Sequence, residues 1–355
     1  MKERIDYIDV AKGLGMFLVI WGHIKHGGIS PSFVYSFHMP LFFFISGMLF
    51  VPSKYSSFIL FLKKKSQSLL LPYIVYSILT WLIWLGYNAT SSGSGVNYFF
   101  PLLQTFLAQG STGYLLHNAP LWFITCLFIV EAIFYLITRR INGGYLLLLT
   151  LGLAIISTYL VNRYSWYAKL PWNFEVALVA LFFYACGNVL AIHYSIKKIY
   201  EIVSTRVVLF SAICVALLFL LVVFAKVNDC ADMGADYFTK NHYFFLLTGV
   251  MGSIFVVLLS AIIFVKLNKS VFSPVVSFCK WFGLNSMDIL SIHVPIKGII
   301  IVLLAHVLGI SISDSYFYGL GESILAFILT VITISIAVLI IMKIKKLYYR
   351  YVKRV

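Results

Sequence analysis

The sequence predicts an all-α, polytopic integral membrane protein with about ten transmembrane helices, and three observations support this prediction. Of the 355 residues, 61% are hydrophobic and 11% are charged, whereas soluble domains are about 45–50% apolar and about 25% charged. Apolar residues run unbroken for about 17 to 23 positions, long enough for a helix to cross the bilayer core. These runs lack the alternation of polar and apolar residues that is typical of membrane β-barrels.

Ten spans follow from the hydropathy of the chain, and we expect them to form one membrane domain over residues 1–355. The first apolar run has no small-residue cleavage site, so it is expected to be a retained span. Both termini are expected in the cytoplasm, with the protein crossing the cell (inner) membrane many times. The predicted spans are 8–24, 37–52, 69–87, 120–138, 144–161, 174–194, 207–225, 243–265, 287–308 and 320–342.

The orientation of the spans follows from the distribution of positive charge. The net charge of +15 would also suit a nucleic-acid-binding protein. However, 20 of the 27 Lys and Arg residues fall in segments on the cytoplasmic side, five fall in outer segments and two lie within spans. This asymmetry is the positive-inside pattern of membrane proteins. We therefore expect membrane lipid as a partner and no nucleic acid.

Few residues lie between the spans, and no soluble domain is expected. Outer segment 88–118 predicts a loop with a short interfacial helix from Tyr98 to Phe106. A second outer loop, 226–241, carries three aspartates, and inner segment 269–284 is expected to lie along the membrane surface. The five cysteines show no metal-binding or redox spacing, so no metal is expected.

The first span contains two titratable residues, Lys12 and His23. Such residues are costly within a bilayer and are therefore functional candidates. Eleven residues separate them, which places them about 16 Å apart along the helix axis and on nearly the same face. His23 then lies near the outer mouth, where it suits a general base acting on a hydroxyl, or it anchors the helix at the interface.

Two further residues are expected at the depths of His23 and Lys12. His38 begins the second span at the depth of His23, where it could share catalysis, position a substrate or cap the helix that Pro40 starts. Glu131 lies about 12 residues into the fourth span, and Lys12 lies about as deep in its own span. This shared depth predicts a Lys12–Glu131 pair, with a catalytic or a purely structural role.

The ninth span adds a second group of candidates. Ser286 is expected to cap a helix whose first turn holds Asp288. His293 and Lys297 are one turn apart and share a face. With Lys12 they would line an inner vestibule whose positive charge suits a polyphosphorylated ligand. A basic run before the third span could extend this surface or act only as a topology signal: Lys63, Lys64 and Lys65.

Several of these residues fall in blocks that resemble the membrane acyltransferase-3 family, in particular its fucose 4-O-acetylases and exopolysaccharide acyltransferases. The resemblance runs the length of the chain, and the block from His23 to Gly47 is the most specific part of it. One departure is that the family often has an Arg-x-x-Arg pair where this chain has Lys63 to Ser68. The matching stretches are residues 4–23, 36–47, 120–123 with Glu131, and 283–295.

The resemblance implies a ten-helix core that transfers an acyl group, usually acetyl from acetyl-coenzyme A (acetyl-CoA), to a sugar hydroxyl of a surface glycan or lipid-linked sugar. The family's signature of a basic residue and a histidine eleven positions later falls on Lys12 and His23. The expected catalytic residues are His23, either as base or as acyl carrier, His38 and Glu131. The expected residues for the acyl-CoA donor are Lys12, Lys63, Lys64, Lys65 and Lys297. Those expected for the substrate are Trp122, Asn285, Ser286 and His293.

Two alternatives remain open from the sequence. One is a succinyltransferase on the same scaffold, and the other is a transporter or flippase for a glycan or lipid-linked sugar. Intramembrane charges and aromatic loops also suit transport. Binding or hydrolysis of acyl-CoA by the purified protein would distinguish an enzyme from a transporter.

Overall fold

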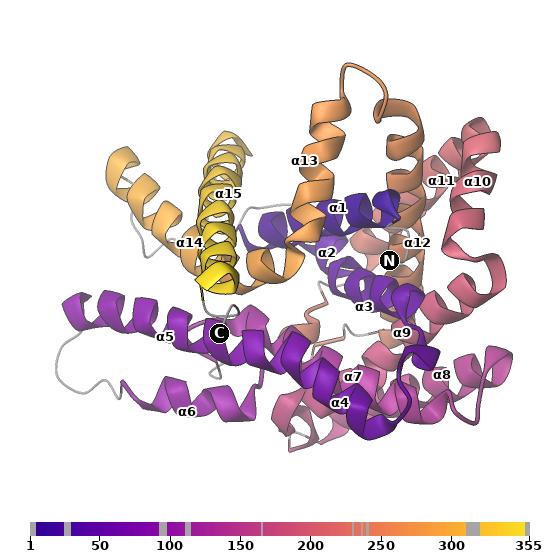
Figure 1. Cartoon of the computed structure of the whole chain (residues 1–355), viewed down its shortest axis with the longest axis horizontal. Helices are drawn as coiled ribbons and strands as arrows, with labels where there is room; N and C mark the ends of the chain where they lie inside the picture. The colour runs from indigo at the N-terminus through magenta and orange to yellow at the C-terminus, as the bar shows by residue number, and fades with distance from the viewer. Residues whose placement is uncertain are drawn as a thin grey trace.

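A computed structural model shows that the chain is built almost entirely from helices (Figure 1). In the part of the chain that the structure describes, no β-sheet forms, and the one β-bridge joins Asp232 to Tyr237. The predicted all-α class is therefore confirmed. The structure describes residues 5–24, 30–91, 98–110, 115–164, 166–228, 231–235, 237–238, 241–309 and 320–351.

The helices follow one another with short connections. The first eight are α1 (Asp6–His23), α2 (Ser30–Tyr35), α3 (His38–Leu49), α4 (Phe58–Lys65), α5 (Leu71–Ser91), α6 (Phe100–Leu107), α7 (Trp122–Ile137) and α8 (Gly143–Arg163). The others are α9 (Phe174–Tyr194), α10 (Ile196–Thr205), α11 (Val207–Val227), α12 (His242–Leu267), α13 (Ser273–Leu284), α14 (Ser286–Leu308) and α15 (Leu320–Tyr351). Short 3-10 turns are η1 (Pro52–Lys54), η3 (Ala119–Leu121), η4 (Tyr167–Lys169), η5 (Pro171–Asn173) and η6 (Met233–Ala235), and a π-helical turn, η2 (Ser66–Leu70), joins α4 to α5.

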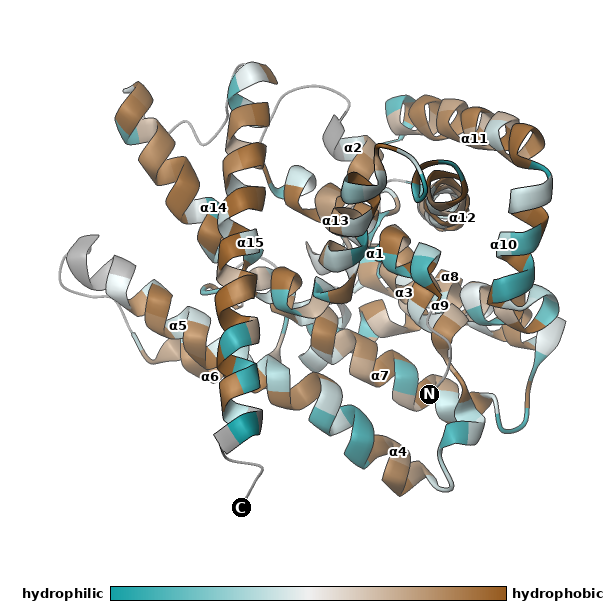
Figure 2. Ribbon diagram, turned by 45° about the horizontal axis from the view of Figure 1, so that its top comes forward, coloured by the Kyte–Doolittle hydropathy of each residue, from teal (hydrophilic) through white to brown (hydrophobic). Residues whose placement is uncertain are grey.

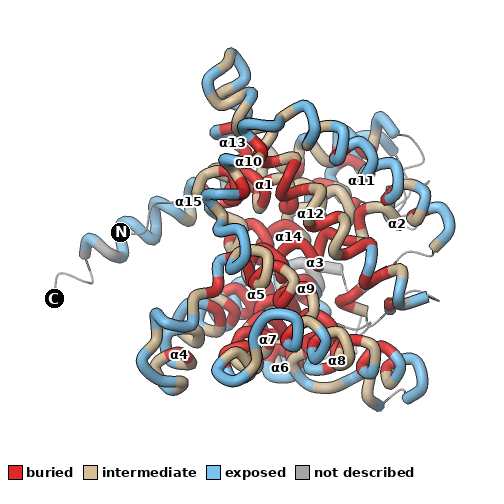
Figure 3. Tube along the Cα trace, turned by 90° about the vertical axis from the view of Figure 1, so that its right-hand side faces the viewer, coloured by how far each residue is buried: buried red, intermediate tan, exposed pale blue. Residues whose placement is uncertain are grey.

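Among the described residues, nine helical segments are long and apolar enough to cross a membrane, and they overlap nine of the predicted spans. The remaining predicted span is α1, whose 18 residues include the charged side chains Asp6, Asp9 and Lys12. Most of α1 is buried among other helices, as the red segments of Figure 3 show. The chain is thus a multi-pass membrane protein, and α1, the predicted span that contains three charged side chains, is mostly buried.

Glycines bring the central helices into close contact. Where α3 crosses α9, a Cβ atom on Gly47 or Gly187 would overlap a backbone carbonyl oxygen of the facing helix. The crossing of α1 and α13 uses Gly13 and Gly283 in the same way. Small residues at helix crossings allow the close backbone approach on which membrane helix packing depends. These crossings fix the positions of α1 and α3, whose outer ends carry two of the candidate histidines.

The outermost helices present apolar surface, as expected for contact with lipid. Figure 2 shows mostly apolar residues along α11, α14 and the upper part of α15. On α11, Val208, Val215 and Phe219 expose 67–85% of their surface. Such exposure in a helix of this hydropathy indicates a bilayer environment. Hydrophilic residues gather instead on α4, α10 and the C-terminal part of α15 (Figure 2).

The segments between the spans partly match their predictions. The short helix predicted at residues 98–106 is α6, which α5 holds through a 2.6 Å hydrogen bond from the Tyr73 hydroxyl to the Thr105 carbonyl oxygen. Inner segment 269–284 contains α13, whose Phe282 ring stacks on Phe17 of α1 at a centroid distance of 4.5 Å. Helix α10 was not predicted, because its ten residues are too short and polar for a span.

The predicted role of Ser286 as a helix cap is wrong. Helix α14 begins at Ser286 itself, Asn285 holds the N-cap position, and no side chain caps the helix there. Asp288 does lie in the first turn, but its carboxylate accepts hydrogen bonds from Lys345 at 2.7 and 2.8 Å and from the Tyr76 hydroxyl at 2.7 Å. These bonds tie α14 to α15 and α5.

Candidate active site

Three histidines from three helices meet at the outer end of α1. His23 is the last residue of α1, His38 is the first residue of α3, and His293 lies in the second turn of α14. The rings of His23 and His293 are 5.0 Å apart between centroids. Tyr35 joins the other pair, with its ring 6.3 Å from His23 and 4.8 Å from His38. The prediction that His23 and His38 lie at one depth agrees with this geometry.

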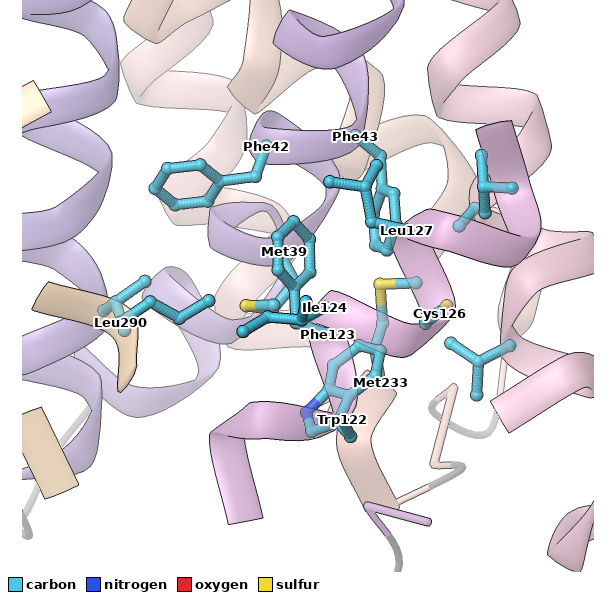
Figure 4. Packing of buried hydrophobic residues seen from close by; sticks show 14 of the residues in the cluster. Met39, Phe42, Phe43, Trp122, Phe123, Ile124, Cys126, Leu127, Met233 and Leu290 are labelled. Atoms are coloured by element: carbon cyan, nitrogen blue, oxygen red, sulfur yellow. The ribbon is translucent and has the colours of Figure 1, made fainter. Parts of the chain in front are cut away.

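His23, Tyr35 and His38 line a small cavity of about 70 Å³, called here the histidine cavity. Apolar side chains form part of its wall, namely Met39 from α3, Leu290 from α14 and Trp122 from the start of α7. Figure 4 shows Trp122 at the edge of the apolar cluster that Phe123 and Ile124 continue along α7. The other residues that line the cavity are Val19, His23, Tyr35, His38, Gly110, Ala119, Pro120, Asp232 and Gly234.

Hydrogen bonds to backbone carbonyls orient two of the imidazoles. His38 Nδ1 lies 2.9 Å from the Val34 carbonyl oxygen, and His293 Nδ1 lies 2.8 Å from that of Leu290. A carbonyl oxygen only accepts, so in a neutral ring Nδ1 carries the proton and Nε2 keeps the lone pair. His38 therefore does not cap α3. It lines the cavity with a nitrogen that is able to take up a proton.

The Nε2 atom of His293 is buried and has no hydrogen-bond partner. An unsatisfied buried polar atom is costly and is often tied to function. This nitrogen belongs to the ring that lies against His23. No three His, Cys, Asp or Glu side chains are arranged to hold a metal ion in the described part of the chain.

The predicted inner vestibule of Lys12, His293 and Lys297 is wrong. Lys297 Nζ donates to the backbone carbonyl oxygen of His23 at 3.3 Å, and His293 packs on the His23 ring. Both residues therefore lie at the outer end of α1, about 16 Å along the helix from Lys12. The register of α14 against α1 causes this difference, because α14 meets α1 through its second and third turns.

Two outer loops close the histidine cavity, and the sequence did not identify their residues as functional. Gly110 follows α6, and Gly234 lies in the loop after α11. A Cβ atom on Gly110 would lie 2.7 Å from Trp122 Cγ, and one on Gly234 would lie 2.5 Å from Trp122 Nε1. Only glycine permits this close approach, so the two loops and the indole pack directly on one another.

Asp232 places a carboxyl group in the wall of the cavity. Its Oδ1 accepts hydrogen bonds from the backbone N–H groups of Gly234 at 2.9 Å and Ala235 at 3.2 Å. Burial raises the pKa of Asp232 above its ordinary value of 3.8, against the opposite effect of these two bonds. In the sequence, the aspartates of the predicted outer loop indicated that a carboxyl group could contribute to a site. Their spacing did not indicate that Asp232 lines the cavity with His23.

The inner end of α1 borders a second and larger cavity of about 610 Å³, called here the lysine pocket. Its wall includes Lys12 of α1, Lys54 of η1 and Lys197 of α10. Lys12 Nζ also lies 3.6 Å from the Asp9 carboxylate. The prediction that Lys12 belongs to a cationic inner site therefore has structural support, although its neighbours are Lys54 and Lys197.

The predicted Lys12–Glu131 pair is wrong, because Glu131 pairs with Lys65. The Lys65 Nζ atom lies 2.8 Å from Glu131 Oε1 and 2.7 Å from Oε2, and the Tyr184 hydroxyl is 3.4 Å from Oε1. Glu131 is nine residues beyond Trp122, about 14 Å along α7. Glu131 does not line the histidine cavity, so the geometry does not support the predicted catalytic role of Glu131.

The remaining predicted residues lie apart from both cavities. Lys63 and Lys64 are exposed on α4 and do not line the lysine pocket. Asn285 and Ser286 lie at the junction of α13 and α14, where the Asn285 amide donates to the Trp281 carbonyl oxygen at 2.8 Å. The junction is about 12 Å along α14 from His293. The structure therefore does not bring Asn285 or Ser286 to the histidine cavity.

Comparison with protein families gives one match, to a family model described as an acyltransferase domain, over residues 5–342. No curated protein and no solved structure matches the chain. The match covers nearly the whole chain, including both cavities and all ten predicted spans. The chain therefore belongs to the membrane acyltransferase-3 family and is an acyltransferase.

Proposed function

We propose that this protein transfers an acetyl group from acetyl-CoA to a sugar hydroxyl of an exported or cell-surface glycan at the inner membrane. One observation carries the proposal. Helix α1 joins a pocket with three lysines at its inner end to a cavity with two histidines, His23 and His38, at its outer end, where His293 packs on the His23 ring. Lys12 and His23 are about 16 Å apart along this helix, comparable to an extended pantetheine arm.

The lysine pocket suits the phosphates of the donor. Phosphates bind Lys and Arg through short, charge-assisted hydrogen bonds. Lys12, Lys54 and Lys197 supply three ammonium groups around one space of about 610 Å³. Lys12 remains a proposed donor contact, and Lys54 and Lys197 replace the other predicted ones, Lys63, Lys64, Lys65 and Lys297. Lys65 pairs with Glu131, and Lys297 lies at the other end of α1.

The histidine cavity suits the transfer step. The sugar hydroxyl oxygen attacks the thioester carbonyl carbon, a C–O bond forms, the C–S bond breaks, and the hydroxyl proton passes through a histidine to the coenzyme A sulfur. His23 acts either as the base for this proton or as a transient acyl carrier. In the second route, a ring nitrogen of His23 first attacks the thioester carbon, so that a C–N bond forms, the C–S bond breaks and coenzyme A leaves as the thiol. The sugar hydroxyl then attacks the acyl-imidazole, a C–O bond forms, the C–N bond breaks, and His38 Nε2 holds the lone pair that takes the proton from the sugar.

The cavity wall also offers contacts for a sugar. Small-molecule sites combine aromatic surface with a few placed polar groups. Trp122 supplies an aromatic face, and the Asp232 carboxylate can accept hydrogen bonds from neighbouring sugar hydroxyls. We therefore keep Trp122 as a proposed substrate contact and add Asp232 to it.

The test uses cells that lack this gene and carry either the wild-type protein or His23→Ala. We expect the variant to lower the acetyl content of the cell-surface glycan by about 10²–10⁴-fold, the range for loss of a general acid–base group. Purified His23→Ala should bind acetyl-CoA within twofold of wild type. The exposed residue His306 on α14 provides a matched control, since His306→Ala should retain full acetylation.

Two outcomes would contradict the proposal. Near wild-type acetylation by His23→Ala would remove His23 from the mechanism. Failure of the purified wild-type protein to bind acetyl-CoA would remove acetyl-CoA as the donor, and a succinyl group on the glycan would redirect the proposal to succinyl transfer. Acid-quenched protein incubated with acetyl-CoA alone separates the two routes, because only an acyl carrier leaves an acetyl group on His23.

A further inference from the structure

The histidine cavity has an apolar side that the proposed proton transfers do not use. Three helices each contribute one residue to it, namely Val19 of α1, Met39 of α3 and Leu290 of α14. These three side chains are called here the apolar wall. Each of them lies no more than four positions from the histidine of its own helix. The apolar wall therefore borders the same space as His23 and His38.

The apolar wall is part of the packed core. Val19, Met39 and Leu290 expose only 1%, 8% and 5% of their surface. All three belong to one apolar cluster, which Figure 4 shows in part with Met39 and Leu290 labelled. Protein interiors are packed about as densely as organic crystals, so that even one added methylene group disturbs the packing. The wall therefore cannot accommodate a larger group without displacing its neighbours.

The volume of the cavity matches a small acyl group. An engineered apolar cavity of about 150 Å³ holds one benzene molecule, a ring of six carbon atoms. The histidine cavity, at about 70 Å³, is about half as large, which leaves room for about three heavy atoms. An acetyl group consists of two carbons and one oxygen. A butyryl group is two methylene groups longer, and a succinyl group carries a carboxylate where butyryl has its methyl group.

The transfer step brings the acyl chain into this cavity. During transfer the thioester carbonyl carbon lies beside His23, and the next carbon of the acyl group is bonded directly to it. That carbon therefore lies one bond length from the reacting atom. The sugar is proposed to contact Trp122 and Asp232, which leaves the apolar wall for the acyl chain. A carboxylate against this wall would find no polar partner among the three wall residues, and burial of such a charge is costly.

We infer that the apolar wall of Val19, Met39 and Leu290 limits the length of the acyl group and so makes the enzyme selective for acetyl. This inference rests on the proposed function and adds the residues that determine donor specificity. One methylene group in an apolar pocket changes discrimination by about 10–200-fold. The selection acts on transfer more than on donor binding, because the proposed phosphate contacts lie in the lysine pocket, at the other end of α1.

Two substitutions enlarge the cavity from different helices. Leu290→Ala and Met39→Ala each remove side-chain atoms from the apolar wall. Leu181→Ala and Met16→Ala are the matched controls, because both residues are buried in the same apolar cluster and neither lines the cavity. A general loosening of the core would affect all four variants, whereas enlargement of the acyl site affects only the first two.

The experiment uses inverted membrane vesicles from cells that lack the chromosomal gene and carry the full-length wild-type or variant protein. The vesicles supply the native acceptor, and acetyl-, propionyl- or succinyl-CoA is added at the cytoplasmic face. Mass spectrometry of the glycan gives the initial rate for each acyl group. Wild type should transfer acetyl about 10–200-fold faster than propionyl, and succinyl more slowly than propionyl.

The variants are compared by their ratio of propionyl to acetyl transfer. Leu290→Ala and Met39→Ala should each raise this ratio at least tenfold over wild type, and Leu181→Ala and Met16→Ala should change it less than twofold. Both rates come from the same vesicles, so a smaller amount of folded variant does not alter the ratio.

The outcomes separate this inference from the proposed function. Wild-type transfer of propionyl or succinyl as fast as acetyl would overturn the inference and leave the proposed function standing. A ratio that stays within twofold of the controls in both Leu290→Ala and Met39→Ala would have the same meaning. Absence of every acyl increment from the glycan of wild-type vesicles would overturn both.

Discussion

The two ends of α1 carry different kinds of site. At the outer end, two imidazoles and a tyrosine line a cavity of about 70 Å³, which two outer loops close. At the inner end, three ammonium groups border a pocket of about 610 Å³. A group-transfer step gains from a small site that excludes water, because electrostatic interactions there are stronger. Binding of a polyphosphate requires a larger space and positive charge instead. One helix can therefore take part in both donor binding and group transfer only if its two ends have different surroundings.

Packing explains why the two ends differ. The outer end is closed by contacts of the Gly110 and Gly234 loops with the Trp122 indole, where no side chain would fit. At the inner end two of the three lysines, Lys54 and Lys197, come from η1 and α10, outside the tightly packed α3–α9 pair. Both residues are exposed, and their long side chains border the pocket without being buried in it.

The largest expected effect that tests this comparison is the loss of His38. His38→Ala removes the lone-pair nitrogen from the outer cavity and should lower the transfer rate by about 10²–10⁴-fold, as for other acid–base groups. Donor binding should not change, because His38 is at the opposite end from the lysine pocket. Glycan acetylation and acetyl-CoA binding measured side by side provide the test. A variant that loses donor binding as well would show that the two ends are not separate sites.

The next effect concerns the Lys65–Glu131 pair, which lies in neither cavity. Removing one partner of a buried ion pair costs about 3–5 kcal/mol, whereas replacing both with apolar residues is often neutral. Glu131→Met should therefore lower the unfolding temperature strongly, and Lys65→Met/Glu131→Met should recover it together with acetylation. Thermal unfolding of the purified protein measures the first effect. A double variant that folds well but stays inactive would return Glu131 to the catalytic mechanism.

A smaller effect is expected at the lysine pocket. Lys12→Gln, Lys54→Gln and Lys197→Gln should each raise the KM for acetyl-CoA by about 5–30-fold, since a charge-assisted bond contributes roughly 1–2 kcal/mol. Added salt should reduce the difference from wild type, because these charges are partly screened. Lys198→Gln is the matched control, one residue along α10 and outside the pocket. An equal effect of Lys198→Gln would indicate general surface charge in place of a phosphate site.

The sequence predicts the spans well, because length and hydropathy alone decide what a bilayer accepts. It also predicts that His23 and His38 share a depth, since a short connection between two spans must return to the same side. Depth does not say which helices are neighbours, however. Lys12 and Glu131 lie on helices whose partners differ, and Glu131 meets Lys65 from the α4 helix instead.

The residues that the sequence missed lie in connecting segments. Tyr35, Gly110 and Asp232 reach the histidine cavity because tertiary contacts fold their loops over it. Periodicity carries no information on such segments, and the hydropathy of Lys54 or Lys197 resembles that of any cytoplasmic lysine. The sequence also does not predict how far α14 is shifted along α1. For this reason His293 and Lys297 were expected at the inner end.

The smallest expected effect is a pH dependence at Asp232, the carboxyl group in the wall of the outer cavity. Burial raises the pKa of Asp232, so the folded protein holds this proton more tightly than the unfolded chain does. The stability that the protonated form contributes is complete below about pH 4, the ordinary value, and is lost as pH rises through the raised pKa. Above the raised pKa the ionised carboxylate therefore destabilises the fold.

Asp232→Asn removes this charge and keeps an oxygen that can accept the N–H groups of Gly234 and Ala235. The variant should unfold at a higher temperature than wild type at pH 7, by about 2–4 °C if the gain is near 1 kcal/mol. The difference in unfolding temperature between the variant and the wild type should shrink as pH falls toward 4. Its acetylation activity should fall at the same time, because a destabilising group in a site is retained for function. Glu322→Gln, a carboxyl change on α15 outside the cavity, is the control. A variant that is both more stable and fully active would show that the outer cavity works through its histidines alone.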